Sequence, residues 1–327
     1  MGNYGRKKIY INNINYNNMF YLNRNIFRKS SLTLTSKPIQ RPTSTSTLLH
    51  THVSKKNLEE DIRKNDIEES KRRLYSMPYI PSKKHYSPVI PLTIYQTWYT
   101  KNLSPSMQKN LDNIKQQNPE FRYELYDDNE CREFIRIHFS SYVLKAYDTL
   151  IPGAYKADLW RYCVLYKNGG MYMDVKLSCI NGFKLIELCE TEHYVLDKYD
   201  FNIPTPIYNA LMVCKKNNPF LLEAIYKVVK NVERKYYGFN ALCPTGPGML
   251  SEIIQEVKMK GVNPNLNIDI HHYYDSTGLV YHDRFIMSLE YPEYRNEQAL
   301  SYKKINKKYY LTHWHEGSIY LKNEGAK

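Results

Sequence analysis

The stretch GAYKADLWRYCVLYKNGGMYMDVK, residues 153–176, constrains the fold of this chain more than any other. Apolar side chains at helical spacing predict a helix through residues 154–167, namely Leu159, Tyr162, Cys163 and Tyr166. Gly169 and Gly170 suit the left-handed turn that ends a helix. The short strand that follows ends on Asp174, where a strand entering a core would continue with an apolar residue. This pattern predicts a functional site at the end of that strand.

From residue 89 onward, strand and helix signals alternate over short links. We expect strands at 89–98 and 121–128, and helices within 104–119 and 129–139. Strand–helix–strand order predicts an α/β fold with a mostly parallel central sheet flanked by helices. Ligands of such sheets bind at the carboxyl ends of the strands. The residues to consider there are Gln96, Thr97, Asp127 and Asp174.

The positive charge of the chain is concentrated near its start. Residues 1–85 hold 17 of the 46 Lys and Arg residues but 6 of the 33 Asp and Glu residues, so their net charge is +11 and that of the remainder is +2. Residues 1–50 contain no acid and no sustained period, which predicts disorder, and residues 55–74 predict a solvated linker helix. We therefore expect a basic low-complexity extension and linker over 1–85 and one folded domain over 86–327.

Two further readings of the basic extension stay open beside plain disorder: an organelle transit peptide, and a tail that makes peripheral contact with an anionic surface. No apolar run reaches the roughly 18–20 residues of a membrane span. The six cysteines form no C-x-x-C pair, and no apolar secretory segment precedes them. We expect reduced thiols, a cytoplasmic location and no nucleic-acid partner.

Asp158 and Arg161 are three residues apart on the expected helix and so point to the same side. The glycine turn brings this side of the helix near Asp174, which predicts a cation between two carboxylates at a strand end. An isolated D-x-x-R pair is more often a salt bridge that pins a helix. The strand-terminal acid and the Gly-Gly turn favour a functional site here.

These residues resemble the D-x-D sugar-binding region of glycosyltransferase family 32, which includes yeast-type α-mannosyltransferases. At greater distance they are similar to the catalytic domains of glucosylating bacterial toxins. The family pattern, K-x-D-x-x-R followed by G-G-x-Y-x-D-x-D, is matched at Lys156, Asp158, Arg161, Gly169, Gly170, Tyr172 and Asp174. The resemblance also includes 90–98, 118–128, 245–250 and 312–320, and thus most of residues 90–320.

The resemblance implies a GT-A fold and transfer of a hexose, of the mannose or glucose/galactose type, from a nucleotide-diphosphate sugar to a glycan, lipid or protein acceptor, with retention of configuration. It also implies catalytic roles for Asp158, Arg161 and Asp174, the first two at the sugar hydroxyls and the phosphate side of the donor. Asp174 would contact the ribose and metal-bound water. The residues implied to lie beside the nucleotide sugar are Gln96, Thr97, Trp98 and Tyr172.

The chain departs from the family pattern at two positions. Lys176 stands where the second acid of the family binds the metal, and Ile319 stands where relatives carry a Trp. Lys176 is therefore a candidate to face the donor diphosphate as a substitute for the metal. We nevertheless expect a divalent metal, Mn²⁺ or Mg²⁺, at Asp174, because a strand-end acid facing an anionic ligand calls for a cation between them. His313 and His315 would alternate on one face of a strand and are candidate nitrogen ligands.

Gly246 and Gly248 precede a predicted helix in the stretch CPTGPGML. Free backbone amides at a helix N-terminus would bind donor or acceptor oxygens, and a tight loop that opens the helix is an equally good explanation.

Two alternatives to a transferase stay open. The substitutions at Lys176 and Ile319 fit an inactive GT-A domain that serves as a binding or scaffold protein. The basic extension fits an anion-binding adaptor in which the folded domain is a carrier.

Overall fold

A computed structural model describes residues 76–198, 203–261, 266–273 and 277–322, and scattered positions between 62 and 73. The predicted disorder of residues 1–50 lies outside the described residues. The described positions from 62 to 73 are helical and exposed. All described residues belong to one unit, residues 59–327.

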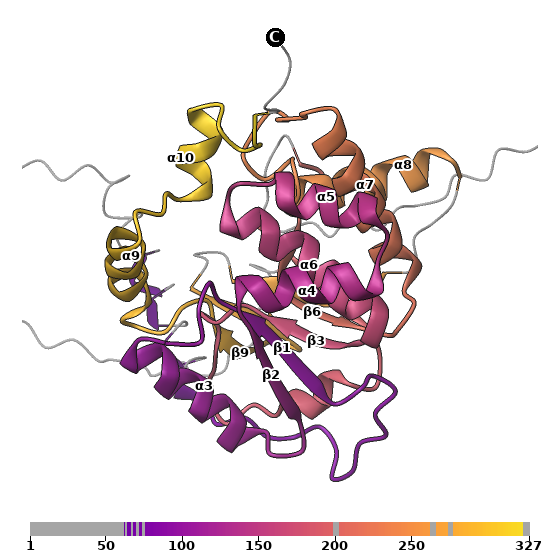
Figure 1. Cartoon of the computed structure of the whole chain (residues 1–327). Coiled ribbons are helices and arrows are strands. Elements are labelled where there is room, and N and C mark those ends of the chain that lie inside the picture. Colours follow the sequence, from indigo (N-terminus) through magenta and orange to yellow (C-terminus); the bar gives the residue numbers. More distant parts are fainter. Residues whose placement is uncertain are drawn as a thin grey trace, which may run out of the picture. The chain divides into compact units, whose positions relative to one another are not determined.

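Nine strands of the described chain form one sheet in the order β2-β1-β3-β6-β5-β7-β8-β9-β4. Figure 1 shows the neighbouring strands β2, β1, β3 and β6. The strands are β1 (Thr93–Thr97), β2 (Arg122–Tyr126), β3 (Gly170–Met173), β4 (Ser178–Cys179), β5 (His193–Leu196), β6 (Ile207–Cys214), β7 (Ile270–His272), β8 (Gly278–Tyr281) and β9 (Arg284–Ser288). The α/β class expected from the sequence is confirmed.

The expectation of a mostly parallel sheet is wrong for the second half of the chain. The pairs β1–β2, β1–β3 and β5–β7 are parallel, and the other five pairs are antiparallel. One reason is visible between β8 and β9, where His282 and Asp283 both have positive φ (47° and 58°). Two such residues make the tight turn that joins antiparallel strands, whereas parallel strands need a long crossover.

Six of the nine described strands nevertheless end at the same edge of the sheet. The pairing directions make β1, β2, β3, β5, β7 and β9 run the same way. We call the edge where they end the carboxyl edge. The strand ends expected from the sequence to carry ligands therefore meet there, although the sheet is mixed.

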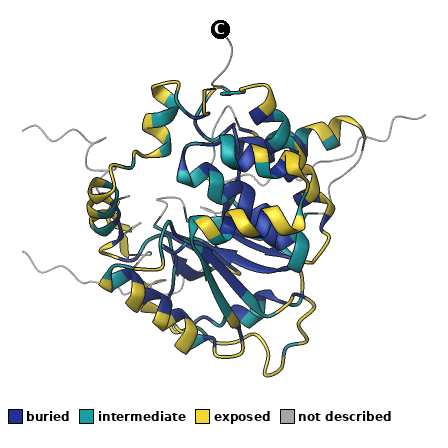
Figure 2. Cartoon of the chain, viewed as in Figure 1, coloured by how far each residue is buried: buried dark blue, intermediate teal, exposed yellow. Residues whose placement is uncertain are grey.

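Helices cover both faces of the sheet (Figure 1). Alternate residues of β3 show this, because Tyr172 packs with the helical layer of α4 to α8 and Met171 and Met173 pack on the opposite face near α3. Figure 2 shows the buried strands between exposed outer helix faces. The helices are α3 (Pro105–Gln117), α4 (Asp128–His138), α5 (Ser141–Thr149), α6 (Gly153–Asn168), α7 (Pro219–Glu233), α8 (Pro247–Met259), α9 (Tyr294–Lys304) and α10 (Tyr310–His315), with a 3-10 turn at Leu185–Leu188.

Local sequence signals explain where several of these helices begin. Pro105 opens α3 as expected. Asp127 caps α4 in a capping box with Glu130, so its carboxylate is used by the helix and is not free for a ligand. Each described helix that was expected between residues 104 and 168 is present.

The link from α6 to β3 depends on two glycines. Gly169 and Gly170 have φ of 68° and 113°, which side-chain-bearing residues rarely adopt. A Cβ on Gly170 would also lie 2.8 Å from the Thr93 carbonyl oxygen of the neighbouring strand. The turn therefore sets how closely α6 and β3 approach β1.

We expect Gly170→Ala to destabilise the fold much more than Gly261→Ala. Gly261 also has positive φ (76°), but its Cβ would meet nothing within 4 Å. The free energy of unfolding of the Gly261 variant should fall only by the cost of placing an alanine at positive φ, about 1–2 kcal/mol. The Gly170 variant should lose more, because the Thr93 carbonyl must also move. Urea unfolding midpoints test this, and equal losses would contradict it.

Candidate active site

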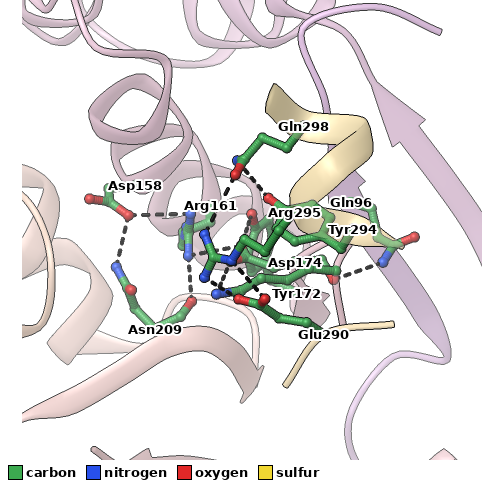
Figure 3. A network of polar contacts seen from close by, with 11 residues as sticks. Gln96, Asp158, Arg161, Tyr172, Asp174, Asn209, Glu290, Tyr294, Arg295 and Gln298 are labelled. Atoms are coloured by element: carbon green, nitrogen blue, oxygen red, sulfur yellow. Dashed lines mark hydrogen bonds and ion pairs between the residues drawn. The ribbon is translucent and has the colours of Figure 1, made fainter. Parts of the chain in front are cut away.

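Arg161 lies buried between two carboxylates at the carboxyl edge (Figure 3). Its side chain is 6% exposed; Nη2 lies 3.2 Å from Asp158 Oδ1 and Nη1 lies 3.4 Å from Asp174 Oδ1. Nη1 also donates a 2.7 Å hydrogen bond to the Asn209 carbonyl oxygen. The guanidinium stacks over the Tyr172 ring, with 4.3 Å from Cζ to the ring centroid. The structure thus brings together the three residues assigned catalytic roles from the sequence.

Asp158 is held by Thr245, from the stretch 245–250 that the sequence singled out, and by Asn209, to which the sequence did not point. Thr245 Oγ1 donates to Oδ2 (2.7 Å), and Asn209 Nδ2 donates to Oδ1 (2.9 Å). Burial raises the pKa of Asp158, while Arg161 and these two donors act in the lowering direction. Asn209 lies on β6, far along the chain from Asp158, so no local pattern could have shown it.

Asp174 follows β3 directly and is surrounded by donors. Tyr172 Oη donates to its Oδ1 at 2.8 Å, and Lys176 Nζ lies 3.9 Å from Oδ2. Gln96 Nε2 donates to the Asp174 carbonyl oxygen at 3.3 Å. The structure therefore gathers Gln96, Tyr172, Asp174 and Lys176 around one strand end, as the sequence predicted.

Thr97 and Trp98 make different contacts. Thr97 Oγ1 donates to the Tyr126 carbonyl oxygen (3.0 Å) and touches Cys131 Sγ (3.2 Å), so it faces α4. Trp98 is buried beside Val175 and stacks on Tyr302 at 6.0 Å between ring centroids. Trp98 therefore belongs to an aromatic cluster next to Asp174, and Thr97 does not contact the Asp174 group.

The glycine loop before α8 does not offer the free backbone amides that were predicted. The amides of Gly246 and Gly248 both donate to the Leu242 carbonyl oxygen at 3.2 Å, so the expectation that they are free is wrong. A Cβ on Gly246 would lie 3.4 Å from Asp158 Oδ2, whereas one on Gly248 would meet Cys243. The loop therefore contacts Asp158 through Gly246 and Thr245, and Gly248 serves local packing.

The expected strand arrangement of His313 and His315 is also wrong. Both lie on helix α10, where residues two apart point in different directions. His313 Nδ1 is paired with Ser318 Oγ at 3.0 Å, and His315 is exposed. Ile319, the second departure from the family pattern, is fully buried in the core.

The side chains around Asp174 do not fit a directly bound divalent metal. Mn²⁺ and Mg²⁺ favour carboxylate and other oxygen ligands, but both Asp174 oxygens already face cations, Arg161 on one side and Lys176 on the other. Among the described residues no group of three or more His, Cys, Asp or Glu could hold an ion, so Asp174, His313 and His315 form no ligand cluster. An ion 4 Å from the Lys176 ammonium would be opposed by about 4 kcal/mol per unit of its charge at an effective dielectric of about 20.

Further polar groups at the carboxyl edge were missed by the sequence analysis. Arg295 at the start of α9 pairs with Glu290 and lies in the same network as Asp174 (Figure 3). Tyr208 and His272 pack edge to face at 4.3 Å between ring centroids. Neither the Tyr208 hydroxyl nor either His272 ring nitrogen has a hydrogen-bond partner within the described ranges.

Residues 104–192 match the family model described as "Glycosyltransferase sugar-binding region containing DXD motif". The chain is 31% identical over 172 residues to inositol phosphoceramide mannosyltransferase 3 of Schizosaccharomyces pombe, covering 51% of this chain and 45% of that protein. It is 24% identical over 184 residues to mannosyl phosphorylinositol ceramide synthase SUR1 of Saccharomyces cerevisiae, covering 56% and 46%. The chain thus spans less than half the length of these two relatives. The matches confirm the resemblance to glycosyltransferase family 32.

Two solved structures are also similar. The PaToxG glycosyltransferase aligns with a TM-score of 0.40 and 18% identity over 62% of this chain and 81% of that chain. The glycosyltransferase domain of the YGT toxin aligns with a TM-score of 0.32 and 10% identity over 55% of this chain and 70% of that chain.

In the part of the chain that the structure describes, no helix is both long and apolar enough to cross a membrane.

We expect Arg161→Lys to lower the free energy of unfolding by about 2–4 kcal/mol. Lysine keeps the positive charge but lacks the planar set of N–H donors that contact Asp158, Asp174 and the Asn209 carbonyl. The control is Arg132→Lys, which alters an exposed pair with Asp148 and should change stability little. Urea unfolding measures both. Similar values for the two variants would show that the buried network does not depend on the guanidinium.

Stability should fall in acid partly through His272. Burial, and then Lys176, lower the pKa of His272 to about 4, even though Nδ1 lies 3.4 Å from Asp197 Oδ1. From pH 6.5 down to about 4 the unfolded chain binds a proton at this residue that the folded chain does not. This costs up to about 3 kcal/mol of stability across that window. His272→Asn should remove this part of the pH dependence of the free energy of unfolding. If variant and wild type differ in this free energy by the same amount at pH 6.5 and at pH 4, the prediction is contradicted.

Proposed function

We propose that this chain, a relative of the DXD-region glycosyltransferases, transfers a hexose from a nucleotide-diphosphate sugar to a glycan, lipid or protein acceptor. The observation that carries the proposal is the buried Arg161 held between Asp158 and Asp174 at the carboxyl edge. A guanidinium that is fixed in this way places a positive charge beside Asp174 without reorganising, where the phosphate side of a donor would bind.

The chemistry of the transfer explains why cations belong at this edge. The bond from the sugar to the diphosphate breaks, and negative charge builds on the leaving phosphate oxygen. Fixed positive groups aimed at that oxygen stabilise the transition state. Arg161 and Lys176 are the positive groups that contact Asp174 in this site. Asp158 would orient the sugar through its hydroxyls, and Trp98 would lie beside the nucleotide.

The names of the two yeast relatives suggest which donor sugar and acceptor to test first. Both yeast proteins have names that refer to mannosyl transfer onto inositol phosphoceramide, so mannose is the first donor sugar and an inositol-containing lipid the first acceptor to test. Retention of configuration is proposed from the family resemblance. Glucose and galactose donors complete the panel.

The test is release of nucleoside diphosphate from GDP-mannose, UDP-glucose and UDP-galactose by the purified chain. We expect turnover with one donor and a loss of about 10²-fold or more in kcat for Asp174→Asn, because the carboxylate that fixes Arg161 and Lys176 is neutralised. Asp112→Asn, which changes an exposed acid on α3, should keep wild-type rates.

Absence of turnover with every donor and acceptor would favour an inactive domain that serves as a scaffold. Turnover that survives Asp174→Asn in a folded protein would place the reaction elsewhere on the chain.

A further inference from the structure

The backbone that carries Lys176 is fixed on both sides. The Leu177 amide donates to the Asp174 carbonyl oxygen at 3.0 Å, which closes a turn directly after β3. Asn110 of α3 is buried and donates to the carbonyl oxygens of Val175 (3.1 Å) and Leu177 (2.9 Å). The Lys176 carbonyl oxygen accepts from the Tyr291 amide at 3.0 Å. Lys176 is therefore part of a clamped turn.

The Lys176 side chain points into the carboxyl edge. It is 19% exposed, and its Nζ lies 3.9 Å from Asp174 Oδ2 and 5.5 Å from the centroid of the Tyr208 ring. The side chain is therefore not extended into solvent. Its ammonium stands beside the carboxylate oxygen that Arg161 and Tyr172 leave uncovered.

The charges of four side chains that are linked by these contacts balance one another. Asp158 and Asp174 carry two negative charges, and Arg161 and Lys176 carry two positive charges. An acid in place of Lys176, as in the D-x-D pattern, would make the net charge −2, which a divalent cation would neutralise. The change from acid to lysine alters the local charge by two units, the charge that such a cation would bring.

We propose that Lys176 replaces the divalent metal, so that this site binds the diphosphate of its nucleotide ligand through a fixed ammonium and needs no metal. The inference rests on the proposed function, because it assumes that a nucleoside diphosphate binds at Asp174. It is the alternative to the expectation of Mn²⁺ or Mg²⁺ drawn from the sequence. It also gives Asp174 a role, because its carboxylate holds Lys176 and Arg161 in place.

The test is calorimetric binding of GDP and of UDP to the full chain, each with EDTA and with Mn²⁺. For the wild type we expect the Kd of the nucleotide that binds to differ less than threefold between the two conditions. Lys176→Ala should weaken binding at least tenfold in EDTA. Lys145→Ala removes an exposed lysine on α5 and should bind like the wild type.

Lys176→Asp restores the D-x-D pattern and supplies the sharpest comparison. This variant should bind nucleotide only with Mn²⁺, and paramagnetic resonance of Mn²⁺ should then show bound ion that the wild type lacks. Thermal unfolding checks that each variant is folded.

Wild-type binding that EDTA weakens tenfold or more would overturn the inference and leave the proposed function standing. Equal affinity of wild type and Lys176→Ala in EDTA would also overturn it. Failure of both nucleotides to bind under either condition would contradict the proposed function together with the inference.

Discussion

The burial of Arg161 is the constraint on which the rest of the site depends. A guanidinium removed from water is stable only if its donors meet acceptors. Three segments supply its contacts: α6 with Asp158, β6 with the Asn209 carbonyl, and β3 with the Tyr172 ring beneath the guanidinium and Asp174 directly after the strand. Each of these segments must keep its position for the cation to remain paired, so one buried charge couples the helical layer to the sheet.

Although the sheet is mixed, the polar residues of the site lie together at its carboxyl edge. Because β1, β3 and β5 run in the same direction, Gln96, Asp174 and Asp197 all lie at the carboxyl edge. The antiparallel β6 between β3 and β5 brings Asn209 to the same edge from the opposite direction. A ligand site at the strand ends therefore does not need a fully parallel sheet, only strands that end together.

The sequence predicted the parts of the structure that local patterns determine. The helix at 153–168, the Gly169–Gly170 turn, the strand before Asp174 and the juxtaposition of Arg161 with two acids all follow from residues within about 20 positions of one another. Asn209 and Arg295 were missed because their roles come from tertiary packing over long separations, and the same packing sets the contact of Thr245 with Asp158. The histidines of α10 were assigned to a strand because two residues in alternation do not distinguish a strand from a single helical turn. The hairpin between β8 and β9 was overlooked although His282 and Asp283 are residue types that tolerate its turn.

The central claim is that the donor diphosphate meets a charge-balanced group of Arg161, Asp174 and Lys176. Crystals grown with the bound nucleotide and excess Mn²⁺, measured at the manganese absorption edge, test it most directly. We predict a phosphate oxygen within hydrogen-bond distance of Lys176 Nζ and no anomalous peak beside Asp174. A manganese peak that bridges the Asp174 carboxylate and the diphosphate, with Lys176 turned away, would contradict the account.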